Sequence, residues 1–376
     1  MRILITLNYY APYVSGLTNV ARDVAEGLAA RGHDVLVLTT QHDRSLPPSE
    51  TINGVRVRRF PVRVRLGKGV IAPGLVPAVI RAARTADVVN IHAPMLEAGP
   101  IAAGARRAGT PVLFTYQCDI AMPPSLLGRL QSRAMDASTT AAARNSRAVI
   151  VSSSDYAAHS RVSRALAHNQ LVIPPGCHDR RGGTGRFRES DGLHVGFLGR
   201  IVEEKGIEYL VRGFTALSDP EARLLIAGDF AHIAGGSVIA RVREAIGRDD
   251  RIRMLGFLAD DDLPDFYASL DAFALTSVNS FEAFGIVQVE AMMAGVPALV
   301  TDMPGVRTPV QETGFGTIVP PRDSAAITSA LRKLSTLALP ADGPDRARAL
   351  FANERGVQRY QELIDEVLEG AGRGTR

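Results

Sequence analysis

Two carboxylates, Glu282 and Glu290, stand eight positions apart in the segment SFEAFGIVQVE, residues 280–290. Residues 286–294 carry apolar side chains on all sides and no helix breaker, so this stretch is expected to be a helix. Glu282 would then lie in the preceding loop and Glu290 in the second helical turn. A helix N-terminus offers unpaired N–H groups and a partial positive charge. The spacing indicates carboxylates that bind hydroxyls on either side of an anion, whereas a lone pair of glutamates is more often merely solvated.

A basic motif lies upstream, GRIVEEKG at residues 199–206. It follows the apolar, partly β-branched run HVGFL, which is typical of a buried strand. Gly199 lets the backbone turn tightly, and Arg200 and Lys205 then lie ahead of a helix expected around residues 208–217. A planar guanidinium and a compact ammonium together could neutralise a diphosphate. A basic pair in a loop is usually only solvated, but the glutamate motif beside it favours a binding site.

Taken together, G-R-x-x-x-x-K-G followed by E-x7-E resembles the signature of the family-4 retaining glycosyltransferases, which have the GT-B fold. The resemblance covers nearly the whole chain. It also includes five shorter matches: MRILITLNYYAP at 1–12, SG at 15–16, AARGHDV at 29–35, VIPPG at 172–176 and RIRMLG at 251–256. It implies an α/β protein in which two Rossmann-like parallel-sheet domains face a central cleft. The C-terminal helix is expected to cross back to the first domain.

The length of 376 residues agrees with two domains, because a single core rarely serves so long a chain. We expect an N-terminal acceptor-binding domain at residues 1–173, joined by the last helix at about 357–376. A nucleotide-sugar-binding domain is expected at 174–356. The polar, glycine-rich stretch at 176–187 is typical of a linker, and residues 370–376 are expected to fray.

Strands and helical stretches alternate along both halves, which predicts parallel sheets. The expected strands are 2–7, 34–39, 88–92, 112–117, 148–152 and 171–173, then 195–199, 224–228, 252–256, 272–276 and 298–301. Gly16, Arg200 and Glu282 each follow such a strand, at the sheet edge where open α/β sheets bind ligands. The run 55–65 alternates apolar and basic residues, as a strand pair with one buried face would. That run could instead contact anionic lipid or an acidic acceptor.

The resemblance assigns roles to residues at matching positions. Arg200 and Lys205 would stabilise the leaving diphosphate of a nucleotide-sugar donor, Glu282 would hold the donor sugar, and Glu290 would accept hydrogen bonds from the ribose. The remaining donor-binding candidates are Gly16, Gly199, Phe257, Phe284, Gly285 and Ile286. Family frequency favours a UDP-sugar donor, and the acceptor would be a hydroxyl of a lipid, a glycan or a small natural product. The family further implies retention by front-face attack, without a bound metal or a separate cofactor.

One catalytic position departs from the family pattern. Relatives often carry histidine where the segment TYQCD, residues 115–119, has Gln117. An amide can hydrogen-bond a sugar hydroxyl but cannot carry a positive charge. Asp119, followed by residues 120–124, is expected either to shape an acceptor pocket or to form a structural loop. His92 and Tyr10 complete the acceptor-binding candidates, although a satisfied histidine at the edge of the cleft is the more ordinary interpretation of His92.

Other patterns exclude several classes of site. The formal net charge of +4, without aromatic-basic interleaving, argues against a nucleic-acid partner. Cys118 and Cys177 have neither disulfide-framework nor zinc spacing. The acidic run 260–262 precedes Pro264 and is better explained as a helix start than as a metal site. Without an apolar leader or a membrane-length apolar run, the protein is expected to be cytoplasmic.

Two alternatives remain open from the sequence. One is a catalytically silent relative that binds nucleotide sugar as an assembly partner, which the replacement at Gln117 favours. The other is a dinucleotide-dependent oxidoreductase, but G-x-G-x-x-G does not follow Leu4-Ile5, where that class requires it.

Overall fold

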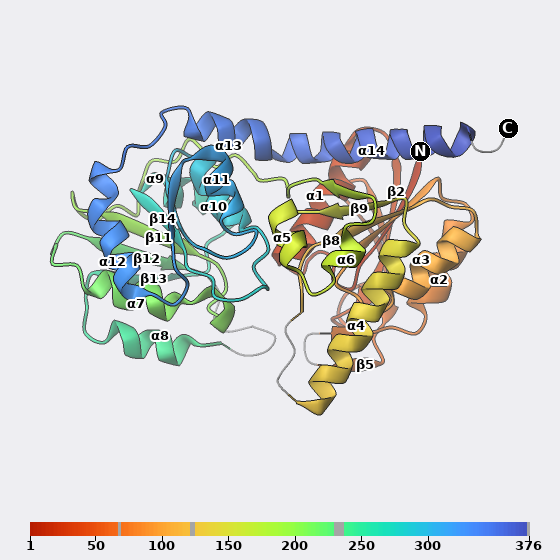
Figure 1. The fold of residues 1–376 in the computed structure, drawn as a ribbon, viewed down its shortest axis with the longest axis horizontal. Helices are drawn as coiled ribbons and strands as arrows, with labels where there is room; N and C mark the ends of the chain where they lie inside the picture. The colour runs from red at the N-terminus through yellow and green to blue at the C-terminus, as the bar shows by residue number, and fades with distance from the viewer. Residues whose placement is uncertain (67–68, 121–124, 229–236, 374–376) are drawn as a thin grey trace. The chain divides into compact units, whose positions relative to one another are not determined.

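The computed structural model describes residues 1–66, 69–120, 125–228 and 237–373. It divides into two compact units (Figure 1). Unit 1 comprises Met1–Gly176 with Asn353–Arg376, and unit 2 comprises Cys177–Ala352. The sequence placed these boundaries at 173/174 and 356/357, and the glycine-rich linker lies almost wholly in unit 2.

Unit 1 is built on an eight-stranded sheet in the order β10-β9-β8-β7-β1-β2-β4-β3. Its strands are β1 Arg2–Thr6, β2 Asp34–Gln41, β3 Ser49–Ile52, β4 Val55–Pro61, β7 Val88–Ala93, β8 Val112–Tyr116, β9 Ala148–Val151 and β10 Gln170–Val172. All neighbours are parallel except β3 and β4. The central strands β7 and β8 are buried along their whole length, as expected for a sheet covered on both faces.

The prediction that residues 55–65 form a strand pair with each other is wrong. Strand β4 pairs with β2 on one side and with β3 on the other. The following β5, Val64–Leu66, forms a separate hairpin with β6, Gly69–Ile71. The alternation was read correctly as one buried face, but alternation alone does not identify the partner strand.

Seven helices of the described chain cover this sheet. They are α1 Gly16–Ala30, α2 Leu75–Ala83, α3 Ala98–Arg107, α4 Leu126–Arg144, α5 Ser154–His159, α6 Ser163–Leu166 and α14 Asn353–Arg373. The C-terminal α14 packs on α1 so closely that a Cβ on Gly27 would lie 2.5 Å from Val357 Cγ2. Tyr360 and Ile364 of α14 join the core of unit 1, which confirms the predicted return of the last helix. The helix is assigned as far as Arg373, and the expectation that the chain frays toward its end stays a prediction.

Unit 2 contains a six-stranded parallel sheet in the order β13-β12-β11-β14-β15-β16. The strands are β11 His194–Leu198, β12 Arg223–Ala227, β13 Ile252–Gly256, β14 Ala272–Leu275, β15 Ala298–Thr301 and β16 Gly316–Val319. The first five match the sequence expectation closely. Edge strand β16 was not anticipated, because its four residues begin with glycine and offer only a short apolar run.

Helices cover both faces of the unit 2 sheet. They are α7 Ile207–Thr215, α8 Ile239–Ile246, α9 Leu263–Ala268, α10 Ile286–Met293, α11 Thr308–Thr313, α12 Ser324–Lys333 and α13 Gly343–Phe351, with 3-10 turns η1 Glu203–Lys205, η2 Asp260–Asp262 and η3 Leu334–Thr336. One core gathers around Phe197 and Phe214, and the other around Phe273 and Met292. The acidic run 260–262 is the turn that leads into α9, as the helix-start interpretation predicted.

Each sheet has one topological switch point, where consecutive parts of the chain leave a central strand in opposite directions. In unit 1 it lies between β1 and β7, and in unit 2 between β11 and β14. Ligands of open α/β sheets bind in the crevice at the carboxyl ends of such strands. The fold therefore directs attention to the loops after β11 and β14 in unit 2 and after β1, β7 and β8 in unit 1.

The loops after β11 and β12 approach each other without room for a side chain. Gly228 has φ +146°, and a Cβ placed on it would lie 1.8 Å from the carbonyl oxygen of Gly199. Because the contact is backbone to backbone, no rotamer change can relieve it. This approach fixes the start of the loop that carries Arg200.

Replacing Gly228 by alanine should therefore destabilise unit 2 by more than the ~1–2 kcal/mol of left-handed strain alone. Gly295, with φ +91° and nothing within 4 Å of the position that a Cβ would take, is the matched control for strain without collision. Chemical denaturation of both variants measures the difference. Equal losses of unfolding free energy would contradict the close approach of the two loops.

Candidate functional site

The two sequence motifs meet at the switch point of unit 2. The ammonium of Lys205 forms an ion pair with the carboxylate of Glu282, which comes from a segment 77 residues away. Both side chains are 15% exposed, so the pair is shielded from water without being inaccessible. Thr276 Oγ1, just after β14, donates to the backbone carbonyl of Lys205 at 3.1 Å and ties the two loops together.

Arg200 belongs to the same loop but is held less tightly. Its Nη2 lies 3.8 Å from Glu204 Oε1, and its side chain is 37% exposed. Gly199, with φ +152°, turns the chain directly after β11. The arginine is therefore tethered near the switch point with its guanidinium still open to solvent.

The start of α10 requires glycine at position 285. Gly285 has φ +85°, and a Cβ there would lie 2.4 Å from Leu275 Cδ2. Gln288 Nε2 braces this turn by donating to the carbonyl oxygens of Phe284 and Val306 at 2.6 and 2.8 Å. Ile286 is the first helical residue, so the unpaired N–H groups of the helix begin there.

The ring of Phe284 packs edge-on against the ring of Phe351 inside the core, at a centroid distance of 5.4 Å. Only the backbone of Phe284 is therefore available to bind a ligand. Phe257 differs, because it follows β13 with 72% of its surface exposed. Gly16 is the first residue of α1, and nothing lies within 4 Å of the position that its Cβ would take. Packing within the protein therefore does not require glycine at this position.

Glu290 lies in the second turn of α10, as predicted, and its side chain is only 4% exposed. Arg180 Nε donates to its Oε1 at 3.3 Å, and the hydroxyl of Tyr267 donates to its Oε2 at 3.3 Å. Burial raises the pKa of Glu290, while the Arg180 guanidinium acts in the opposite direction. Sequence reasoning missed Arg180, since a charged residue in a glycine-rich linker gives no signal of what it contacts.

The unit 1 candidates Gln117 and His92 are brought together. Gln117 Nε2 lies 3.0 Å from His92 Nδ1 and donates to the carbonyl of Leu17 at 3.2 Å. The other ring nitrogen lies 3.0 Å from Asn90 Nδ2. Burial lowers the pKa of His92 to about 3, so the ring is neutral near pH 7. A neutral imidazole accepts at one nitrogen only, so one of these two amides must face the ring with its oxygen.

The C-terminal helix supports this group from within unit 1. The Tyr360 ring stacks on His92 with centroids 6.5 Å apart, and its hydroxyl lies 3.2 Å from Thr115 Oγ1. Gln117 is therefore positioned by a buried network that reaches from β7 and β8 to α14. The sequence suggested a satisfied histidine at position 92, and its partners are as that interpretation requires.

Asp119 and Tyr10 are both buried within unit 1. Asp119 Oδ1 accepts from Tyr116 Oη at 2.5 Å and Ser160 Oγ at 2.9 Å, and its N–H donates to Tyr156 Oη at 2.6 Å. Of the two alternatives left open for Asp119, these bonds fit a structural loop. Tyr10 has no exposed surface, and burial raises the pKa of its hydroxyl. Residues 121–124 of the expected acceptor loop lie outside the described residues.

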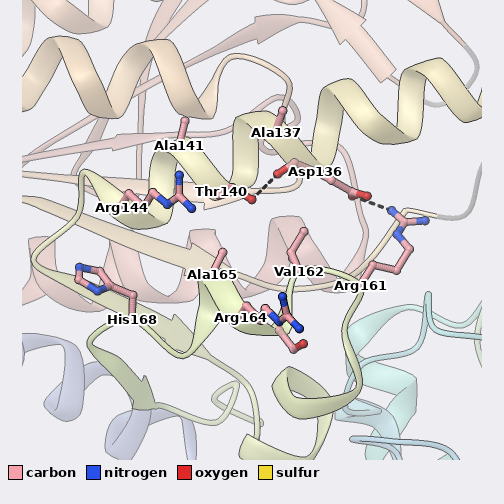
Figure 2. Close-up of a pocket in the computed structure, with 11 residues that line it drawn as sticks. Asp136, Ala137, Thr140, Ala141, Arg144, Arg161, Val162, Arg164, Ala165 and His168 are labelled. Atoms are coloured by element: carbon pink, nitrogen blue, oxygen red, sulfur yellow. Dashed lines mark hydrogen bonds and ion pairs between the residues drawn. The ribbon is translucent and has the colours of Figure 1, made fainter.

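A groove of about 790 Å³ in unit 1 lies between α4 and the α5–α6 segment (Figure 2). Three arginines line it, of which Arg161 pairs with Asp136 at 3.1 Å. The other two are Arg144 and Arg164. None of the sequence-predicted site residues lines this groove. No helix in the described part of the chain is long and apolar enough to cross a membrane.

Comparison with known proteins gives two family matches that together span most of the chain. Residues 15–176 match the model of a glycosyl transferase 4-like domain, and residues 187–349 match that of glycosyl transferases group 1. A GDP-mannose-dependent alpha-mannosyltransferase of Mycolicibacterium smegmatis is 30% identical over 329 residues, 82% of this chain and 81% of that protein. The mannosylfructose-phosphate synthase of Agrobacterium fabrum is 35% identical, but the match spans only 35% of this chain and 32% of that protein.

Solved structures share the fold at lower identity. Sucrose-phosphate synthase from Thermosynechococcus elongatus superposes with a TM-score of 0.77 at 21% identity, covering 98% of this chain and 99% of that one. Anabaena HepE in complex with UDP-glucose gives a TM-score of 0.73 at 21% identity, covering 97% and 100%. These likenesses define the GT-B class of fold.

The chain belongs to the group 1 glycosyltransferases, the family-4 enzymes that its two motifs resemble. It is accordingly a transferase of class EC 2.4, and the silent-relative alternative gains no support.

The buried His92 makes a testable contribution to stability. Its pKa is depressed from the usual 6.5 to about 3 in the folded chain, so the unfolded chain binds the extra proton as pH falls below about 6.5. The stabilisation is thus complete above that pH and is lost progressively toward pH 3. Between about pH 7 and pH 5, the wild type should lose about 2 kcal/mol of unfolding free energy through this group.

His92→Gln, which keeps a hydrogen-bonding side chain, should remove this component from the pH dependence measured by chemical denaturation. His168→Gln, at an exposed position of the same unit, is the control and should leave the wild-type slope. An unchanged slope in His92→Gln would show that His92 is not held neutral.

Proposed function

We propose that unit 2 binds a nucleotide-diphosphate sugar at its β11/β14 switch point and that the enzyme transfers the sugar to a hydroxyl acceptor held by unit 1. The observation that carries this proposal is the Lys205–Glu282 ion pair, which joins the two motifs at the carboxyl ends of adjacent parallel strands. Arg200 and the start of α10 lie in the flanking loops. A cation pair and a helix N-terminus supply the positive environment that a diphosphate needs.

The proposed chemistry follows from where charge develops. Cleavage of the bond between the anomeric carbon and the phosphate oxygen leaves negative charge on the diphosphate and an oxocarbenium-like sugar. The ammonium of Lys205 and the guanidinium of Arg200 stabilise that diphosphate without a bound metal. Glu282, already oriented by its ion pair, accepts hydrogen bonds from donor-sugar hydroxyls with its remaining lone pairs. Cationic groups fixed in this way act most strongly on charge that appears in the transition state.

Retention is proposed through attack on the same face of the sugar. The acceptor oxygen forms its bond to the anomeric carbon on the face from which the diphosphate departs, and the acceptor proton passes to a phosphate oxygen of the leaving group. Gln117, braced by His92 and Leu17, supplies a neutral amide for a sugar hydroxyl. With an amide in place of the usual histidine, this position contributes no positive charge to the reaction.

For the donor, GDP-mannose is the first candidate and a UDP-sugar the second. The relative that matches 82% of this chain is named for GDP-mannose. The UDP-sugar favoured from family frequency is the second candidate. The likeness to HepE, whose structure contains UDP-glucose, is at 21% identity and bears on fold alone. Base recognition is proposed to use the backbone beside Phe257.

Replacing Lys205 by alanine should lower the transfer rate by about 10²–10³, because one of the two cations proposed to stabilise the developing charge is lost. The matched control is Lys333→Ala, since Lys333 is exposed at the end of α12 and remote in sequence from both motifs. Release of GDP from GDP-mannose and of UDP from UDP-glucose measures the rate, with several sugars and polyols as acceptors. Melting temperatures of both variants establish that they are folded.

Near-normal turnover in Lys205→Ala, or an equal loss in Lys333→Ala, would contradict the role of the ion pair. Turnover with one nucleotide sugar and not the other would identify the donor base.

A further inference from the structure

A buried carboxylate needs partners, and Glu290 has three: the side chains of Arg180 and Tyr267 and the backbone N–H of His178. Arg180 Nε reaches Oε1 and the Tyr267 hydroxyl reaches Oε2, each at 3.3 Å. The Tyr267 hydroxyl is shared, because the carbonyl oxygen of Val287 lies nearer, at 3.1 Å. An ionised carboxylate offers about four acceptor positions, so these three donors leave acceptor capacity for a ligand. A hydroxyl of a ribose is a ligand group that can donate to such a free acceptor position.

Arg180 is distinguished from its neighbour by its surroundings. Its side chain is 15% exposed and spans from buried Glu290 to exposed Asp260, whose Oδ1 lies 3.6 Å from Nη2. Arg181 is 58% exposed and pairs instead with Asp179 on the surface. The linker thus presents two consecutive arginines, of which only the first points into unit 2.

We infer that Arg180 is a positioning residue, which keeps Glu290 charged and aimed so that it can bind the ribose hydroxyls of the donor nucleotide. This inference rests on the proposed function and on the role in ribose binding that the family resemblance implies for Glu290. It adds a residue from the linker, outside both sequence motifs, that determines how strongly the enzyme distinguishes a ribonucleotide from its deoxy analogue.

The direction of the pH effect follows from the groups around Glu290. Those facing it are Arg180 and His178 from the linker and Tyr267 from α9. Burial raises the pKa of Glu290, and the charges of Arg180 and His178 lower it. Loss of Arg180 therefore raises that pKa further. Because a protonated carboxyl loses acceptor capacity, nucleotide affinity in the variant should begin to fall at a higher pH than in the wild type.

Calorimetric titration of the full chain with GDP and UDP, and with their 2′-deoxy and 3′-deoxy counterparts, tests this role. Arg180→Gln should bind the ribonucleotide about tenfold more weakly at neutral pH and lose most of the preference for ribose. As pH is lowered, its affinity should begin to decline at a higher pH than that of the wild type. Arg180→Lys, which keeps the charge, should restore the pH profile in part, and Arg181→Gln should match the wild type.

Behaviour of Arg180→Gln identical to that of Arg181→Gln would overturn the inference. Tighter nucleotide binding by Arg180→Gln would also overturn it, because Arg180 would then block access to Glu290 instead of orienting its carboxylate. Arg180→Gln could also weaken binding simply by destabilising the fold, which a lower melting temperature would reveal. The same substitution is then made in a Glu290→Gln background, where Arg180 has no carboxylate to position. In that background the substitution should cause no further loss of affinity. A further loss equal to the one that Arg180→Gln causes in the wild-type chain would contradict the inference. Failure of the wild type to bind any nucleoside diphosphate would overturn the proposed function as well, which distinguishes the two failures.

Discussion

The ion pair between Lys205 and Glu282 is the interaction on which the candidate site of unit 2 depends. Its partners lie 77 residues apart and meet because β11 and β14 are adjacent parallel strands whose carboxyl ends share one edge. The approach is enforced by backbone. Gly206, with φ +58°, leaves room for only a hydrogen, since a Cβ would lie 2.3 Å from the carbonyl oxygen of Thr276. Sheet order, a left-handed glycine and a threonine hydroxyl thus place an ammonium beside a carboxylate where a ligand crevice is expected.

The buried charges of unit 2 are better explained by a role in function than by a contribution to stability. Buried ion pairs recover little of the cost of desolvation, and apolar residues of similar volume often stabilise a fold as well or better. Yet unit 2 keeps Glu290 nearly inaccessible and supplies it with Arg180 and Tyr267 as donors. In unit 1, by contrast, the polar groups near Gln117 are neutral, with His92 depressed to a pKa of about 3. The unit 2 switch point thus carries the Lys205–Glu282 pair, whereas the network around Gln117 consists of amides, a neutral imidazole and hydroxyls.

Much of this arrangement could be predicted from the sequence, because buried parallel strands are continuous apolar runs. Strands β13 and β15 begin and end where expected, and the motif residues fall at strand ends as the alternation requires. What escaped prediction depends on contacts between distant segments. No periodic pattern in the sequence marks the partner strands of β4, the contact of Arg180 with Glu290 of α10, or the stacking of Tyr360 on His92. For Asp119, only the structure reveals three hydroxyl partners that engage it.

The central claim, that Lys205 and Glu282 act as one unit on the donor, is tested most directly by a double-mutant cycle. Transfer rates are measured for Lys205→Met, Glu282→Gln and the double variant with the donor that the wild type uses. Residues that act as a unit give strongly non-additive losses, so the double variant should be little slower than the worse single variant. Losses that multiply in the double variant would show two independent side chains and would contradict the account.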